Sequence, residues 1–161
     1  MNTISTIIID DEPLARDIVK RYASSHQELN IVAECSDGFE ALRQIQLLKP
    51  ELLFLDIQMP KLDGFELLEV LDYRPSIIFT TAFDQFAIKA FEMNAVDYLL
   101  KPFSKERFDS AVQKAIQRIG NSKNDVTDSL ENLKENISQS RGTLDRVVTR
   151  LGSKVTVIPV D

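Results

Sequence analysis

The sequence predicts an α/β fold in which a doubly wound parallel sheet of five strands carries helices on both faces. Two observations carry this prediction: five short apolar segments alternate with five amphipathic ones, and most of the apolar segments lack the alternation expected of a half-exposed strand. A chain of 161 residues, 43% of them hydrophobic, can bury the core of such a fold. Successive strand-helix units imply parallel strands joined by right-handed crossovers.

The elements follow one another in a regular order. Strands are expected at TIIID (6–10), LNIVAEC (29–35), ELLFLD (51–56), SIIFTT (76–81) and VDYLL (96–100). The second alternates more than the others, which favours a place near the sheet edge. Helical patterns cover 13–26, 38–48, 64–72, 84–93 and 104–119. Pro13 suits a first helical turn, Ser104 suits an N-cap, and Gly120 is expected to end the last helix.

Polar residues follow four of the predicted strands, at the carboxyl ends where such sheets bind ligands. They are Asp10, Asp11 and Glu12 after the first strand, Asp56 after the third, Thr80 and Thr81 at the end of the fourth, and Lys101 and Pro102 after the fifth. Neighbouring carboxylates repel one another by about 1 kcal/mol at ~4 Å in water and about 4 kcal/mol at an effective dielectric of 20. Positive charge must therefore accompany them.

Lys101 supplies one positive charge, and a divalent cation with oxygen ligands can supply the rest. Several carboxylates suit Mg²⁺, whereas zinc sites use the clustered His or Cys that this chain, with one of each, does not have. A carboxylate beside Mg²⁺, a lysine and a hydroxyl can attack phosphorus. The residues predict a site for phosphoryl transfer to an aspartate.

Four blocks of sequence carry a resemblance to a known family. IIIDDEP, LLFLDIQMPKLDGFELL, IIFTTAF and AVDYLLKPF resemble, in order and spacing, the receiver domains of two-component response regulators. The resemblance covers residues 4 to about 120. It implies the flavodoxin-like strand order 2-1-3-4-5. It also implies a signalling phosphoacceptor that assists its own Mg²⁺-dependent phosphorylation and dephosphorylation, rather than an enzyme.

The resemblance also implies roles for the acidic residues. Asp56 matches the phosphoacceptor. Asp11 and Asp56 match direct Mg²⁺ ligands, together with the backbone carbonyl of Gln58, and Asp10 would act through water. A sensor histidine kinase is the implied phosphoryl donor.

A second group of residues matches the family's switch. Lys101 would pair with the phosphoryl oxygens, and its peptide bond to Pro102 would be cis. Thr81 matches the switch hydroxyl, with Thr80 as the competing register, and Tyr98 matches the aromatic that moves inward. The face of the fourth helix, fifth strand and fifth helix would then form a homodimer or contact the output.

One departure from the family concerns the fourth helix. The stretch from Thr81 to Lys101 is short, and Asn94 stands where glycine is frequent. Because Asn tolerates the left-handed conformation at helix ends, we expect a shortened fourth helix rather than a damaged site.

The rest of the chain differs in composition. Residues 121–144 are polar, with Val126, Leu130, Leu133 and Ile137 at coiled-coil spacing, and are expected to form a helical linker. Residues 145–161 suggest a hairpin that resembles the opening of a LytTR-type DNA-binding domain of the AlgR, AgrA and LytR kind. The chain is therefore interpreted as a piece of a longer transcriptional regulator, which would contact DNA only through the part of the output domain beyond Asp161.

Two other classes of function fit the sequence less well. A haloacid-dehalogenase-like phosphatase needs an acid two positions after its nucleophile, where this chain has Gln58. A flavodoxin-like redox carrier needs backbone amides around a phosphate, where DDEPLA places acids and a proline. A stand-alone receiver that acts through protein contacts remains the alternative.

Composition adds limits on location and partners. The net charge of −6 gives residues 1–120 no basic surface for nucleic acid. No apolar run is long enough to span a membrane, and the N-terminus lacks a secretion signal, so a cytoplasmic location without membrane partners is expected.

Overall fold

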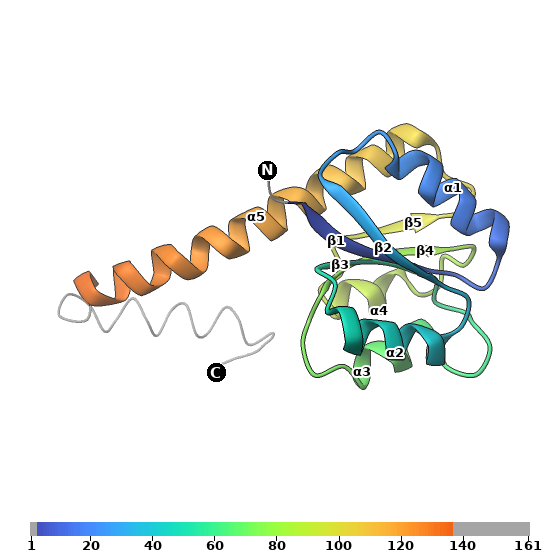
Figure 1. The fold of residues 1–161 in the computed structure, drawn as a ribbon, viewed down its shortest axis with the longest axis horizontal. Coiled ribbons are helices and arrows are strands. Elements are labelled where there is room, and N and C mark those ends of the chain that lie inside the picture. Colours follow the sequence, from blue (N-terminus) through green and yellow to red (C-terminus); the bar gives the residue numbers. More distant parts are fainter. Residues whose placement is uncertain (1–2, 137–161) are drawn as a thin grey trace. The chain divides into compact units, whose positions relative to one another are not determined.

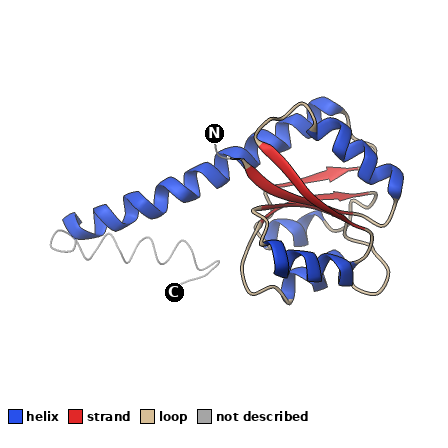
Figure 2. Cartoon of the chain, in the orientation of Figure 1, coloured by secondary structure: helices blue, strands red, loops and turns tan. Residues whose placement is uncertain are grey.

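The computed structural model describes residues 3–136. Five parallel strands form one sheet in the order β2-β1-β3-β4-β5. They are β1 (Ile4–Ile9), β2 (Leu29–Cys35), β3 (Leu52–Leu55), β4 (Ser76–Thr81) and β5 (Asp97–Leu100). Figure 2 shows them side by side with helices on either face. The predicted fold class and strand order are confirmed.

The helices cover the sheet in two groups. They are α1 (Pro13–Ala23), α2 (Gly38–Leu48), α3 (Gly64–Glu69), α4 (Ala87–Glu92) and α5 (Lys105–Asn136). Helices α1 and α5 lie on one face, and α2, α3 and α4 lie on the other (Figure 1). None of the helices in residues 3–136 has the length and apolar character to cross a membrane.

Alternating side chains of the strands give each face its own core. On the α1 and α5 side, Phe54 of β3 is fully buried and stacks on Phe108 of α5 with 5.2 Å between ring centroids. On the α2 to α4 side, Phe79 of β4 packs against Phe65 of α3, also at 5.2 Å. The central strands are buried on both faces, as their unalternated sequences indicated.

Caps define several helix ends. Asp63 and Glu66 form a reciprocal capping box at the start of α3. The hydroxyl of Ser104 accepts the backbone N–H of Arg107 at 3.1 Å, so the predicted N-cap of the last helix is confirmed. Asn94 adopts a φ of 63° after α4, which has six residues. The expectation of a shortened helix closed by this asparagine is therefore also confirmed.

The largest error among the predicted helix boundaries is at the end of the last helix. Gly120 does not end the last helix, which continues to Asn136. None of the glycines in the described residues has a positive φ, and a Cβ at Gly120 would meet nothing within 4 Å. Glycine costs only about 1 kcal/mol relative to alanine within a helix, and here no left-handed turn uses its freedom.

The chain divides into two compact units, Met1–Gly120 and Asn121–Asp161. The first contains the sheet and the candidate site. The predicted hairpin at 145–161 and the end of the predicted linker, 137–144, lie outside the described residues.

Candidate functional site

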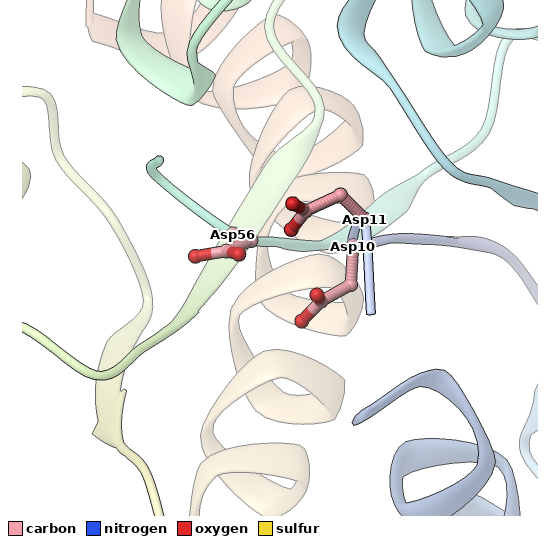
Figure 3. A group of neighbouring side chains, drawn as sticks. All are labelled: Asp10, Asp11 and Asp56. Carbon is pink, nitrogen blue, oxygen red and sulfur yellow. The ribbon is translucent and has the colours of Figure 1, made fainter. Parts of the chain in front are cut away.

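Three carboxylates gather at the ends of two neighbouring strands. Asp10 and Asp11 follow β1, and Asp56 follows β3. These strands pair in parallel with Ile9 opposite Leu55, so the residues that follow them emerge together. One carboxylate oxygen from each of the three residues can be chosen so that these oxygens lie within 4.8 Å of one another. Figure 3 shows the three side chains.

Burial differs among the three. Asp10 is 2% exposed and Asp56 is 5% exposed, whereas Asp11 is on the surface. The backbone N–H of Asp56 donates to the carbonyl of Ile9 at 2.9 Å, which extends the ladder between the strands by one bond. The site therefore rests on rigid sheet backbone and opens to solvent beside Asp11.

Lys101 brings positive charge from the end of β5. Its Nζ lies 2.7 Å from Asp10 Oδ2, 3.3 Å from Glu12 Oε1 and 3.7 Å from Asp56 Oδ2. The backbone N–H of Lys101 donates to the carbonyl of Thr81 at 2.7 Å, and the Lys101–Pro102 peptide bond is cis.

The charges at this site do not balance. Burial, followed by the charge of Asp10, raises the pKa of Asp56 to about 7 although Lys101 acts in the opposite direction. Burial tends to lower the pKa of Lys101, but the hydrogen bond and charge of Asp10 outweigh it and raise that pKa. Three carboxylates face one ammonium group, so the site favours a further cation.

The donor set fits Mg²⁺. Three carboxylates from two strand ends supply hard oxygen ligands, and among the described residues no His or Cys joins them. Gln58 lies two residues beyond Asp56 with its side chain exposed, in the loop before α3. That loop is held close, because a Cβ on Gly64 would come within 2.6 Å of the Asp56 carbonyl.

The predicted switch residues lie on one face of the sheet. Thr81 is fully buried, and its hydroxyl accepts the backbone N–H of Phe83 at 3.3 Å. Tyr98 packs on Phe79 with 6.4 Å between ring centroids, and its hydroxyl donates to the carbonyl of Phe83. Residues 79 and 81 share a face of β4, whereas Thr80 points to the opposite face.

Two contacts at the site were not expected from the sequence. Glu12 pairs with Lys101, and Nη1 of Arg16 donates to the backbone carbonyl of Asp10 at 2.6 Å. Glu12 directly follows Asp10 and Asp11 in the sequence, and this position could have indicated that it also lies near Lys101. Nothing in the sequence indicates that Arg16 reaches a backbone atom.

Comparisons with known proteins agree with this geometry. Residues 6–113 match the response regulator receiver domain family. The chain is 44% identical over 126 residues to the transcriptional regulatory protein BtsR of Escherichia coli, covering 77% of this chain and 52% of BtsR. It is 40% identical over 159 residues to an uncharacterized response regulatory protein of Shewanella oneidensis, covering 98% and 62% respectively.

The sensory transduction protein LytT of Enterococcus faecalis is 43% identical over 117 residues, covering 71% of this chain and 48% of LytT. The chain thus spans about half the length of BtsR and LytT. Among solved structures, the response regulatory domain of mrkE from Klebsiella pneumoniae matches with a TM-score of 0.69 and 34% identity, covering 73% of this chain and 99% of that domain. The chain belongs to the response regulator receiver domain family.

Proposed function

We propose that this chain is a cytoplasmic, Mg²⁺-dependent phosphoacceptor that receives a phosphoryl group on Asp56 from a sensor histidine kinase. The single observation that carries the proposal is the cluster of three carboxylates with Lys101 at the ends of β1, β3 and β5. A carboxylate beside a lysine and a hard cation can act as a nucleophile toward phosphorus. Membership of the receiver family supports the same assignment.

The proposed ligands of Mg²⁺ are Asp11, Asp56 and the carbonyl of Gln58, with Asp10 acting through water. Bound there, the ion would supply positive charge to the oxygens of the transferring phosphoryl group. The ammonium group of Lys101 lies within 4 Å of the carboxylates of both Asp10 and Asp56, and is therefore beside the proposed nucleophile, Asp56.

The transfer makes one bond and breaks another. A carboxylate oxygen of Asp56 bonds to phosphorus, and the bond from phosphorus to the donor histidine nitrogen breaks with its electron pair returning to the imidazole. Asp56 becomes an acyl phosphate. Lys101 then pairs with the new phosphoryl oxygens. The hydroxyl of Thr81 leaves its contact with Phe83 and donates a hydrogen bond to one of these oxygens.

Thr81 would pass the change to Tyr98. In the structure the Tyr98 hydroxyl is held by the carbonyl of Phe83, and the backbone N–H of Phe83 donates to the Thr81 hydroxyl. Movement of Thr81 toward the phosphoryl group therefore breaks the contact that fixes this segment. We propose that Tyr98 then turns inward, since a charge change acts by biasing a two-state element.

The kinase would approach beside Lys101. A hollow of about 490 Å³ lies between α1 and the segment after β5, and Lys101 and Glu12 form part of its wall. Most of its other lining is apolar and includes Leu14, which is 76% exposed. An apolar hollow whose wall includes Lys101, the lysine beside Asp56, suits a protein partner that must bring a phosphohistidine to Asp56.

The homodimer would use the face of α4, β5 and α5. Ile88 and Phe91 of α4 are 76% and 83% exposed, and Leu100 of β5 is 45% exposed. Exposed large apolar residues beside the moving Tyr98 suit a contact that depends on phosphorylation. The same face could instead act on an output domain.

The proposed output is transcription through a LytTR-type DNA-binding domain. BtsR, to which this chain is 44% identical, is a transcriptional regulatory protein, and this supports a role of the same kind here. A stand-alone receiver that acts through protein contacts is the competing proposal. DNase footprinting with the protein encoded by the complete reading frame would separate the two, because only the first predicts a protected DNA segment.

The phosphoacceptor assignment has a direct test. Incubation with radiolabelled acetyl phosphate and Mg²⁺ should label the wild-type chain but not Asp56→Asn. Asp72→Asn is a matched control, because Asp72 is exposed and pairs with Lys49 outside the carboxylate cluster. Label that survives in Asp56→Asn would contradict the assignment.

The dimer has a separate test. Size-exclusion chromatography should show a larger particle with beryllofluoride and Mg²⁺ than without them, and Phe91→Ser should abolish the increase. An unchanged mass in the wild type, or a full increase in Phe91→Ser, would argue against this face.

A further inference from the structure

Arg16 contacts both Asp10, at the end of β1, and Glu34 in the edge strand β2, but it contacts none of the atoms that would react. It lies in the first half of α1, with 18% of its side chain exposed. Its Nη1 donates to the carbonyl oxygen of Asp10 at 2.6 Å, and its Nε lies 3.5 Å from Oε1 of Glu34 in β2. Neither contact has a part in the mechanism proposed above.

The contact with the carbonyl completes the anchoring of Asp10. The backbone N–H of Asp10 donates to the carbonyl oxygen of Cys35 at 3.0 Å. In the side chain of Asp10, Oδ1 accepts a hydrogen bond from the backbone N–H of Glu12 at 3.0 Å, and Oδ2 accepts one from Nζ of Lys101 at 2.7 Å. The carbonyl lies beyond the last paired residue of β2, so the strand ladder offers it no donor. Arg16 takes the place of that missing strand partner.

The peptide bond between Asp10 and Asp11 also determines where the Asp11 side chain lies. Within residues 3–122, no side chain forms a hydrogen bond or ion pair with the Asp11 carboxylate. The Asp10 carbonyl and the Asp11 N–H belong to one planar unit, so a partner for the carbonyl fixes the direction in which Asp11 leaves the backbone. A charged donor makes this hydrogen bond about twice as strong as a neutral one.

We propose that Arg16 is a positioning residue that holds the peptide between Asp10 and Asp11, and thereby sets the affinity of the carboxylate cluster for Mg²⁺. This inference rests on the proposed function of the cluster. Arg16 links Asp11, the one exposed carboxylate of the cluster, to α1 and, through Glu34, to β2.

Positioning and simple charge predict opposite effects, which makes the inference testable. Arg16 is a cation near a cation site, so its long-range field opposes Mg²⁺ binding, and removing the charge alone would tighten binding slightly. Removing the donor that holds the ligand peptide weakens binding instead. Groups that orient metal ligands in this way typically change metal affinity by about 10- to 100-fold.

Lys20 offers a matched control on the same helix. It pairs with the other oxygen of Glu34 at 3.0 Å, one helical turn from Arg16, and forms a further pair with Asp17. It has the same charge as Arg16 and shares its acidic partner, but it makes no contact with Asp10. Lys20→Met therefore reports the effect of charge and of the Glu34 pair without the carbonyl contact.

The experiment is isothermal titration of the 161-residue chain with MgCl₂ alone, with circular dichroism as a check of folding. Arg16→Met should bind Mg²⁺ about tenfold more weakly than wild type, at the lower end of the range for such groups. Lys20→Met should bind as wild type does or slightly more tightly. Arg16→Lys, which keeps the charge and an ammonium donor, should have an affinity between those of wild type and Arg16→Met.

A second measurement separates positioning from a general loss of structure. In acetyl phosphate labelling, the Mg²⁺ concentration that gives half the maximal rate should rise about tenfold in Arg16→Met, while the rate at saturating Mg²⁺ stays that of wild type. A fall in the saturated rate with unchanged Mg²⁺ dependence would overturn the inference.

The possible failures are distinguishable. If the wild-type chain binds no Mg²⁺, the proposed function itself fails. If wild type binds Mg²⁺ and Arg16→Met binds it equally well or more tightly, only the role of Arg16 fails. If Arg16→Met does not fold, wild-type affinity in Arg16→Lys overturns the role instead.

Discussion

Replacing Asp56 by asparagine should stabilise the Mg²⁺-free protein at alkaline pH. Burial, the charge of Asp10 and that of Asp11 raise the pKa of Asp56 from 3.8 to about 7 against the opposing effect of Lys101. The folded protein therefore binds a proton at Asp56 more tightly than the unfolded chain does. Asn removes the charge while keeping nearly the same shape.

The size and sign of the effect follow from this shift. A pKa raised on folding gives stability that is fully present below about pH 4 and is lost as pH rises through 7. At about 1.4 kcal/mol for each pKa unit, the complete loss is at most about 4 kcal/mol. Asp56→Asn should match wild type near pH 4 and exceed its free energy of unfolding by about 2–4 kcal/mol at pH 8.

The assay is urea unfolding followed by circular dichroism, with EDTA present, at pH values from about 4 to 8. Saturating Mg²⁺ should raise the stability of wild type more than that of Asp56→Asn, because the ion offsets repulsion that the variant no longer has. Asp72→Asn, at an exposed carboxylate, should show no such rise with pH. A difference between wild type and Asp56→Asn that does not change with pH, or a less stable variant at pH 8, would refute the reasoning.

Three further substitutions test the fold around the site. Burial favours a higher pKa for Asp97, but hydrogen bonds from Arg107 and other donors outweigh it and lower the pKa to about 2, so Asp97→Asn should cost about 2 kcal/mol at pH 7. That cost should fall as pH drops from about 4 to 2, as followed by urea unfolding. Gly64→Ala should destabilise by about 1–3 kcal/mol because its Cβ would lie 2.6 Å from the backbone oxygen of Asp56, and an unchanged melting temperature would contradict this. Gly120→Ala, with no atom within 4 Å of its Cβ, should instead raise helix content and stability by up to about 1 kcal/mol; a loss of either would argue against a continuous helix there.

The element pattern could be predicted because it depends on local sequence. Unalternated apolar runs identify strands that are covered on both faces, and the order of strands and helices then permits few topologies. Element ends were less accurate. Helix α4 begins at Ala87 rather than at 84 and has no side-chain cap, and Gly120 lies within a helix. These ends depend on how neighbouring segments pack, which a local pattern does not contain.

The sequence by itself determined which residues stand at the ends of the strands, since each of them directly follows or ends an apolar run. Only the tertiary structure decided how they meet. The contact between Lys101 and Asp10 joins residues 91 positions apart, and it exists because β5 and β1 end at the same edge of the sheet. The pKa of Asp56 depends on its burial and on the charges at the ends of β1 and β5. The contact of Arg16 with the Asp10 carbonyl depends on how α1 packs beside the end of β1. Both are properties of distances in space, which residue order along the chain does not specify.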